Sequence, residues 1–303
     1  KESSEKHEGI HGRLSEIQDT FQELQSKVEM LNHHIEDHKR QHDETPIAQV
    51  SSNLRGVSVT TATSVTSRSA SSFGSLGEDT ILLVVASARR PEYLKRCLTK
   101  ITEYHPLGST TIVVSEDGKS SKVLDVVNNA RHLLKDRHNA RIDKSLRLPQ
   151  LLHINHLSLE RFENGYFALS SHYKWALEQV FKKINPIFTY EGDSHVGAHV
   201  VSEIKRVVIL EEDLEISPDF FEYFGALAPI LDRDDKLLTV SAWNDNGQKE
   251  HVRDPSALYR SDFFPGLGWM MTRKLFNELH PKWPRAYWDD WLREPNQRKD
   301  RHT

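Results

Sequence analysis

The chain has 303 residues, of which 28% are charged and 37% hydrophobic, and its formal net charge is -4. This balance is ordinary for a globular protein of one large or two small domains, and it shows no basic excess that would indicate nucleic acid as the main partner. The single cysteine, Cys97, excludes an intrachain disulfide and a cysteine-rich zinc site. No apolar run approaches the roughly 18 residues of a membrane-spanning helix, and no signal peptide begins at Lys1. We therefore expect either a cytosolic protein or a membrane anchor upstream of this chain.

An apolar heptad repeat runs through the first region. Its members alternate in spacing between four and three: Ile10, Leu14, Ile17, Phe21, Leu24, Val28, Leu31 and Ile35. This pattern is the a/d seam of a coiled coil, and one helix cannot bury such a stripe alone. We expect residues 1–41 to form a coiled-coil stem and the chain to be a homo-oligomer, a dimer or trimer, through residues 10–35. The alternative is a surface helix packed on the globular domain.

The composition changes between residues 42 and 79. Ser, Thr and Gly dominate in stretches such as "SVTTATSVTSRSASSFGSLGED", and too little of the segment is large and apolar to build a core. We expect a Ser/Thr-rich flexible linker here, so that stem and linker together resemble a stalk.

Strand and helix patterns alternate from residue 80 to the end of the chain. Apolar runs predict strands at 80–88, 110–118, 150–156 and 206–210, and helical periodicity predicts helices at 91–105, 122–136, 163–183 and 217–231. Pro91 suits the first turn of its helix, and Ser217 is the expected N-cap of the last one. Such alternation predicts an α/β domain with a mostly parallel sheet, which binds ligands beyond the carboxyl ends of its strands. A Gly- and His-containing stretch at 188–203 is interpreted as a surface loop insertion rather than a metal site.

Charged residues follow three of the predicted strands. They are Arg89 and Arg90 after the first strand, Glu116 and Asp117 in the second, and Glu211, Glu212 and Asp213 after the fourth. Carboxylates gathered at one sheet edge repel a polyphosphate unless a divalent cation lies between them, and oxygen ligands favour magnesium or manganese. The alternative is a solvated loop start or a helix N-cap, but the position directly after a buried strand favours a site.

Aromatic residues and carboxylates are interleaved near the end of the chain. The stretch "PKWPRAYWDDWLREPNQRK" at 281–299 places Trp288 beside Asp289 and Asp290. An indole can pack on the apolar face of a sugar ring while a carboxylate accepts a hydroxyl proton. The alternative, core packing with helix-capping aspartates, is preferred for Trp283 but not for Trp288 and Asp289.

Several motifs resemble one known family. In chain order they are "HYKWAL", "VVILEEDLEISPDFFEYF", "SAWNDNG", "YRSDFFPGLGWMM" and "PKWPRAYWDDWLREPNQRK". Together they resemble glycosyltransferase family 13, the N-acetylglucosaminyltransferase I family, over roughly residues 80–301. The resemblance implies a GT-A (Rossmann-like) fold, UDP-GlcNAc as donor with a manganese ion as cofactor, a mannose-terminated glycan as acceptor, and a Golgi enzyme with a lumenal catalytic domain.

The resemblance assigns roles within the acidic triplet. Asp213 would be the one direct protein ligand of the metal, with the UDP diphosphate and waters completing its coordination shell. Glu211 and Glu212 would lie against the sugar and ribose of the donor.

Further donor contacts follow by the same resemblance. Asp117 would contact the uracil and Arg90 the nucleotide, with the adjacent Arg89 as the alternative. His172 matches a donor-site histidine, whereas a lone histidine on a helix, without the resemblance, would be interpreted as structural.

The resemblance also assigns the sugar pocket and the base. Leu267 and Trp288 would line the GlcNAc pocket, and Asp289 matches the catalytic base. Asp289 would deprotonate the 2-hydroxyl group of mannose, whose oxygen attacks the anomeric carbon and inverts its configuration.

Two departures and three alternatives stay open. The middle acid of the triplet is usually Asp in this family, whereas Glu212 resembles a related enzyme that adds GlcNAc to protein O-mannose. The chain also stops at Thr303, soon after the "DDW" motif, so we expect the transferase domain, residues 80–303, to be C-terminally incomplete. The alternatives are β-1,2 transfer to O-mannose, a glycoside hydrolase with paired carboxylates, and an inactive sugar-binding or coiled-coil scaffold protein.

Overall fold

The computed structural model describes residues 76–108, 110–141, 148–183, 203–254 and 256–303. These residues belong to one compact unit. The predicted coiled-coil stem, most of the linker and most of the 188–203 segment lie outside the described residues, so those predictions are untested. No helix among the described residues is long and apolar enough to cross a membrane.

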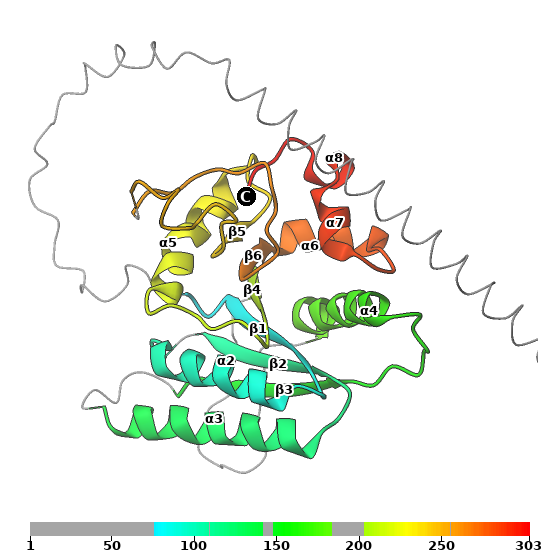
Figure 1. Ribbon diagram of the computed structural model, residues 1–303. Coiled ribbons are helices and arrows are strands. Elements are labelled where there is room, and N and C mark those ends of the chain that lie inside the picture. The colour runs from blue at the N-terminus through cyan, green and yellow to red at the C-terminus, as the bar shows by residue number, and fades with distance from the viewer. Residues whose placement is uncertain (1–75, 109, 142–147, 184–202, 255) are drawn as a thin grey trace, which may run out of the picture. The chain divides into compact units, whose positions relative to one another are not determined.

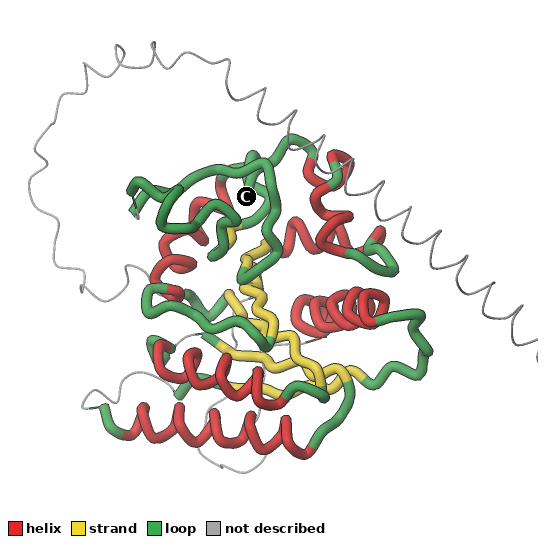
Figure 2. The backbone as a smooth tube through the Cα atoms, viewed as in Figure 1, coloured by secondary structure: helices red, strands yellow, loops and turns green. Residues whose placement is uncertain are grey.

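The centre of the domain is a six-stranded sheet (Figure 2). Its strands are β1 (Thr80–Ser87), β2 (Thr111–Asp117), β3 (Leu151–His156), β4 (Arg206–Glu211), β5 (Val240–Ser241) and β6 (Trp269–Thr272), in the order β3-β2-β1-β4-β6-β5. The first four are parallel, and β6 runs antiparallel to both β4 and β5. The predicted α/β class with a mostly parallel sheet is therefore confirmed, and all four predicted strands are present.

Helices cover both faces of this sheet (Figure 1). One core is shared with α2 (Pro91–Tyr104), α3 (Ser121–Asn139) and α5 (Phe220–Arg233). The other core is shared with α4 (Gly165–Glu178), its π-helical extension (Gln179–Lys183), α6 (Arg273–Leu279) and α7 (Trp288–Arg293). Two further short helices are a 3₁₀ helix (His280–Lys282) and α8 (Pro295–Arg298). Successive residues of β1 point into opposite cores, Leu82 into the first and Leu83 into the second. Because both faces of the strand are buried, it is apolar throughout.

Of the two predicted helix starts, the one at Pro91 is confirmed and the one at Ser217 is wrong. Pro91 is the first residue of α2, as expected, because a proline has no N–H to leave unpaired there. The prediction for Ser217 is wrong, since α5 begins at Phe220. Residues 217–219 instead form a turn in which the Phe220 N–H donates to the Ser217 carbonyl oxygen (3.2 Å) and the Ser217 hydroxyl donates to Asp219 (2.5 Å).

The folded domain includes the last residues that composition assigned to the linker. Leu76 is buried, and its carbonyl oxygen accepts a hydrogen bond from the Thr110 hydroxyl (3.0 Å). Asp79 accepts from the buried Arg206 (2.9 Å), which also forms a two-bond pair with Asp232 at the end of α5. This arginine ties together the beginnings of β1 and β4, so the opposite ends of these strands are left for the candidate site.

Candidate active site

The acidic triplet lies where the central strand β4 ends. Glu211 is the last residue of the strand and is paired with Val85 of β1, while Glu212 and Asp213 form the turn that follows. The Glu212 N–H donates to the Val85 carbonyl oxygen (3.1 Å), which fixes the turn against β1. The sheet thus carries three carboxylates to the carboxyl edge of its parallel strands, where the sequence predicted them.

Arg90 holds two of these carboxylates. Its guanidinium group lies 2.7 Å from an oxygen of Glu212 and 3.1 Å from an oxygen of Asp213. Burial and the charge of Asp213 raise the pKa of Glu212, an effect that Arg90 opposes. Asp213 is more exposed than Glu212, so it is the member of the triplet that is accessible to a ligand.

Tyr173 holds the third carboxylate from the other side of the sheet. Its hydroxyl donates to Glu211 (2.8 Å), and the side chain lies in the core between α4 and the strands. Burial, with repulsion from Asp213 and Glu212, raises the pKa of Glu211 to about 7 although the tyrosine hydrogen bond lowers it. Tyr173 was not among the predicted site residues, and its only signal in the sequence is its place beside His172 in "HYKWAL".

An aromatic layer connects the triplet to α7. The ring of Trp288 is stacked on Tyr173 with 4.3 Å between centroids, and on Trp269 with 5.6 Å. Trp288 is only 4% exposed, so it packs in the core as Trp283 does, and its predicted place in a GlcNAc pocket stays a prediction. Asp289 follows it in α7 with its side chain 40% exposed. Burial, together with the negative charges of Glu211, Glu212 and Asp289, raises the pKa of Tyr173, which places Asp289 in the electrostatic field of the same cluster.

A glycine-containing turn lies against α7 and carries Leu267. Gly266 and Gly268 adopt positive φ angles of 77° and 57°, which residues with a side chain rarely adopt. A Cβ atom at Gly266 would lie 3.8 Å from both Trp288 and Asp289. The turn therefore packs on α7 at Gly266, and the half-buried Leu267 is the next residue in the chain.

A second polar group lies at the end of β2. Asp117 lies 2.9 Å from His156 Nδ1, while His172 on α4 lies 2.8 Å from the Ser115 hydroxyl. The two imidazoles are stacked, 5.3 Å apart and 6° from parallel. Burial lowers the pKa of His172 to about 4, so this ring is neutral near pH 7.

The charge of Asp117 is stabilised within this group. Burial alone raises its pKa, but the hydrogen bond with His156 and the electrostatic attraction of the surrounding groups, Arg89 among them, bring it below its ordinary value. The two arginines are therefore divided, with Arg89 near Asp117 and Arg90 on the triplet. His156 was missed in the sequence, although it ends a predicted strand at the same sheet edge.

The described residues limit how a metal ion could be held. Among them, no group of three or more His, Cys, Asp or Glu side chains is arranged to coordinate one. Asp213 offers a partly exposed carboxylate on which Arg90 already occupies one oxygen. A metal here fits only if further oxygens come from a bound ligand, such as a diphosphate.

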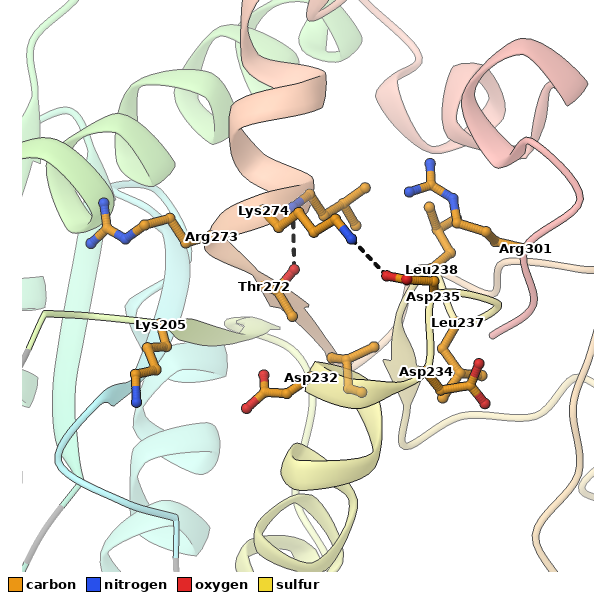
Figure 3. A pocket seen from close by; sticks show the side chains of 12 residues that line it. Lys205, Asp232, Asp234, Asp235, Leu237, Leu238, Thr272, Arg273, Lys274 and Arg301 are labelled. Carbon is orange, nitrogen blue, oxygen red and sulfur yellow. Dashed lines mark hydrogen bonds and ion pairs between the residues drawn. The ribbon is translucent and has the colours of Figure 1, made fainter.

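A cavity of about 250 Å³ lies elsewhere, near the beginning of β4 (Figure 3). It is lined by Lys205, Leu231, Asp232, Asp234, Asp235, Leu237, Leu238, Thr272, Arg273, Lys274, Leu275 and Arg301. Its charges are paired, as Lys274 is with Asp235 (2.6 Å) and Arg301 is with Glu278. No predicted site residue lines this cavity, so we do not assign it to the chemistry of the strand ends.

The fold and the strand-end cluster define an α/β protein of the class whose ligand sites lie at the carboxyl edge of a mostly parallel sheet. Residues 3–303 match the GNT-I family, and the chain belongs to that family. This confirms the resemblance drawn from the sequence motifs.

One curated relative is the alpha-1,3-mannosyl-glycoprotein 2-beta-N-acetylglucosaminyltransferase of Arabidopsis thaliana. It is 40% identical over 228 residues, which are 72% of this chain and 43% of the relative, so the chain spans less than half of that protein's length. Among solved structures, the mannosyltransferase PcManGT of Pyrobaculum calidifontis, in complex with GDP-Man and Mn²⁺, is 17% identical, with a TM-score of 0.38 over 65% of this chain and 46% of that one. S. aureus TarS 1–349 is 13% identical, with a TM-score of 0.42 over 71% of this chain and 54% of that one.

Proposed function

We propose that this protein transfers GlcNAc from UDP-GlcNAc to the 2-hydroxyl group of a mannose on an N-glycan core, with inversion at the anomeric carbon. The observation that carries the proposal is the connection between the triplet at the end of β4 and Asp289 on α7 through Tyr173 and Trp288. Family membership and the name of the Arabidopsis relative support the sugar and the acceptor. A transferase of N-glycan maturation is consistent with a Golgi lumenal location, which we propose as well.

Donor binding follows from the two polar groups at the sheet edge. Asp117, kept ionised by His156, is suited to accept a hydrogen bond from a uracil N–H. The guanidinium group of Arg90 can release Asp213 and donate to diphosphate oxygens with that nitrogen, while its other terminal nitrogen keeps Glu212. His172 is buried and stacked on His156, the partner of Asp117. It is neutral, so its role is to position His156.

We assign Asp213 as the protein ligand of a divalent cation, and propose manganese. When bound, the cation supplies positive charge that stabilises the departing diphosphate. Glu211 and Glu212 remain fixed by Tyr173 and Arg90, so they can orient donor hydroxyl groups without moving during the reaction.

Asp289 acts as the general base. Its partly exposed carboxylate lies 3.3 Å from Arg293, which orients it, and accepts the proton of the mannose 2-hydroxyl group as the oxygen attacks the anomeric carbon. The attack comes from the face opposite the UDP leaving group, so the configuration inverts. Leu267, which follows Gly266 in the turn packed against Trp288 and Asp289, would form an apolar wall for the GlcNAc ring.

The test uses full-length protein with UDP-GlcNAc, with and without Mn²⁺, in calorimetry and in transfer assays. We expect Asp213→Ala to lose metal-dependent donor binding. We expect Asp289→Asn to keep donor binding and to lose on the order of a hundredfold or more in transfer rate. Normal turnover by Asp289→Asn would show that the base assignment is wrong, and absence of metal-dependent nucleotide binding by the wild type would favour a hydrolase or a scaffold protein.

One residue, Glu212, favours protein O-mannose as a second candidate acceptor. Glu212 occupies the middle of the triplet, where the sequence resembles enzymes that add GlcNAc to protein O-mannose. The transfer assay therefore includes both a mannose-terminated N-glycan and an O-mannosyl peptide. Transfer to the peptide alone would replace the N-glycan acceptor by O-mannose and leave the donor chemistry unchanged.

A further inference from the structure

Two exposed tyrosines are stacked on each other beside the candidate site. Tyr166, near the beginning of α4, is 57% exposed, and Tyr287, directly before α7, is 46% exposed. Their ring centroids are 4.6 Å apart with 28° between the planes. Isolated exposed aromatic residues are common, but a stacked pair forms one continuous apolar surface that is able to bind a ligand.

The backbone at Tyr287 is held in an uncommon conformation. Its φ and ψ angles are 51° and 48°, in the left-handed region, which costs a bulky residue on the order of 1 kcal/mol or more. The Trp291 N–H donates to the Tyr287 carbonyl oxygen (3.0 Å) and so fastens this backbone to the first turn of α7. Strain of this kind persists where the surrounding structure requires it, and it is frequent at functional sites.

The segment before α7 is fastened to α4 (Figure 1). The Ser170 hydroxyl donates to the Pro284 carbonyl oxygen (2.8 Å), and the Trp283 indole N–H donates to the Ser170 carbonyl oxygen (3.1 Å). The tyrosine pair therefore lies on a fixed junction of two elements rather than on a loop tip. The same two elements carry Tyr173 and Asp289.

A cation and a further aromatic ring extend this junction. The exposed guanidinium group of Arg285 lies 5.7 Å from the centroid of the half-buried Phe167 ring, which follows Tyr166 in α4. Phenol hydroxyls and a guanidinium group around an apolar face are the groups that bind sugars, because a pyranose has an apolar face and a rim of hydroxyls.

We propose that Tyr166 and Tyr287 form the platform that binds the mannose-terminated acceptor, through packing of a pyranose ring on their exposed surfaces. This inference rests on the proposed function. The two stacked rings are uncharged, and Tyr287 directly precedes the helix that carries Asp289, which must contact the acceptor hydroxyl group. The donor groups Asp117, Arg90 and Asp213 are charged and lie at the strand ends. An uncharged glycan therefore suits the tyrosines better than the nucleotide does.

The test compares variants of full-length protein in initial-rate kinetics with UDP-GlcNAc and a mannose-terminated oligosaccharide. Tyr166→Ala removes one ring, and Tyr287→Asn removes the other while keeping a residue that tolerates the left-handed backbone. We expect each to raise the acceptor KM roughly tenfold, the effect of one lost aromatic contact, while the donor KM stays unchanged. Tyr166→Phe keeps the ring and should stay within about twofold of the wild type.

Controls separate this platform from general damage. Tyr259 is also exposed, but it precedes Arg260, which pairs with Asp234 at the other cavity, so Tyr259→Ala should leave both KM values unchanged. The platform proposal is wrong if both Tyr166→Ala and Tyr287→Asn keep the wild-type acceptor KM. It is also wrong if these variants raise the donor KM as much as the acceptor KM.

Binding of the oligosaccharide without turnover gives an independent measurement. Saturation-transfer NMR should detect mannose-ring contacts with the wild type that Tyr166→Ala loses. If the wild type binds the oligosaccharide through Tyr166 but transfers nothing, the platform stands and the proposed function fails. If the wild type transfers GlcNAc and the tyrosine variants bind and react normally, the proposed function stands and the platform fails.

Discussion

Tyr173 is the residue on which the geometry of the candidate site converges. It donates to Glu211 through its hydroxyl (2.8 Å) and supports Trp288 through its ring (4.3 Å). We expect Tyr173→Phe to keep the stacking and lose the hydrogen bond, so that the free energy of unfolding falls by about 1–2 kcal/mol. Donor affinity should fall roughly fivefold because Glu211 loses its orientation. Urea denaturation and donor titration measure the two effects.

A matched tyrosine tests whether that loss of affinity is specific. Tyr223 on α5 is partly buried, whereas Tyr173 is fully buried, and the Tyr223 hydroxyl likewise donates a hydrogen bond, to the Ser241 carbonyl oxygen (2.6 Å). Tyr223→Phe should lose a similar amount of stability and keep donor affinity. Equal donor affinity in both variants contradicts the role given to Tyr173.

His105 makes the stability of the domain sensitive to acid. Burial lowers its pKa to about 4, against an ordinary value of 6.5. The Leu107 N–H donates to Nδ1 (3.1 Å), so Nε2 carries the proton and donates to the Thr110 carbonyl oxygen (3.0 Å). Protonation of the folded state would break the first of these bonds.

The sign of the effect follows from proton binding. The unfolded chain binds a proton at His105 near pH 6.5 and the folded domain only near pH 4, so stability falls as the pH falls through this window. The contribution of this residue is a loss of about 3 kcal/mol. We expect unfolding curves at pH 7.5 and 4.5 to differ less for His105→Gln than for the wild type. The exposed His132, changed to Gln, should behave as the wild type, and an unchanged pH dependence in His105→Gln contradicts the assignment.

At the scale of elements, Arg293 couples α7 to the glycine-containing turn. Its Nε donates to the Phe264 carbonyl oxygen (2.9 Å), while Nη1 lies 3.3 Å from Asp289 and 2.6 Å from Asp290. A lysine keeps the charge but cannot reach carbonyl and carboxylates together. We expect Arg293→Lys to lower kcat about tenfold and the free energy of unfolding by roughly 1–2 kcal/mol, as measured by transfer kinetics and urea denaturation.

A neighbouring arginine provides the control for this prediction. Arg298 on α8 also donates to a carbonyl oxygen, that of Asp262 (2.9 Å), but it does not contact Asp289. Arg298→Lys should retain the wild-type kcat. A wild-type kcat in Arg293→Lys would mean that α7 positions Asp289 without this arginine.

The sequence predicts those strands that are long enough for their own residues to show the apolar pattern of a buried strand. The strands β1 to β4 are apolar because both of their faces are covered, and every end of these strands lies within one residue of the predicted one. The strands β5 and β6 were missed because they have two and four residues, too few for a period to be visible. Ser217 was wrongly placed because a Ser-Pro-Asp turn and a helix N-terminus use the same residue types.

The candidate site is predictable only in part for a similar reason. The carboxyl-edge rule places Glu211 and Asp213, since it depends on strand direction alone. The roles of Tyr173 and His156 depend on partners 38 and 39 residues away in the chain, so no local pattern could show them. The burial of Trp288 likewise comes from rings on other elements.

At the scale of the whole chain, the heptad repeat of residues 10–35 remains a prediction from sequence. We expect full-length protein to sediment as a dimer or trimer, because the apolar seam is buried only by another helix. Changing Phe21 and Leu24 to Asp places charges at successive a and d positions and should give a monomer. Ser26→Asp, at an outward-facing position of the same heptad, should remain oligomeric. Transfer by the monomeric variant should be unchanged per chain, since the candidate site lies wholly within the described domain. If the wild type sediments as a monomer, the prediction that residues 10–35 form an oligomeric coiled coil is wrong.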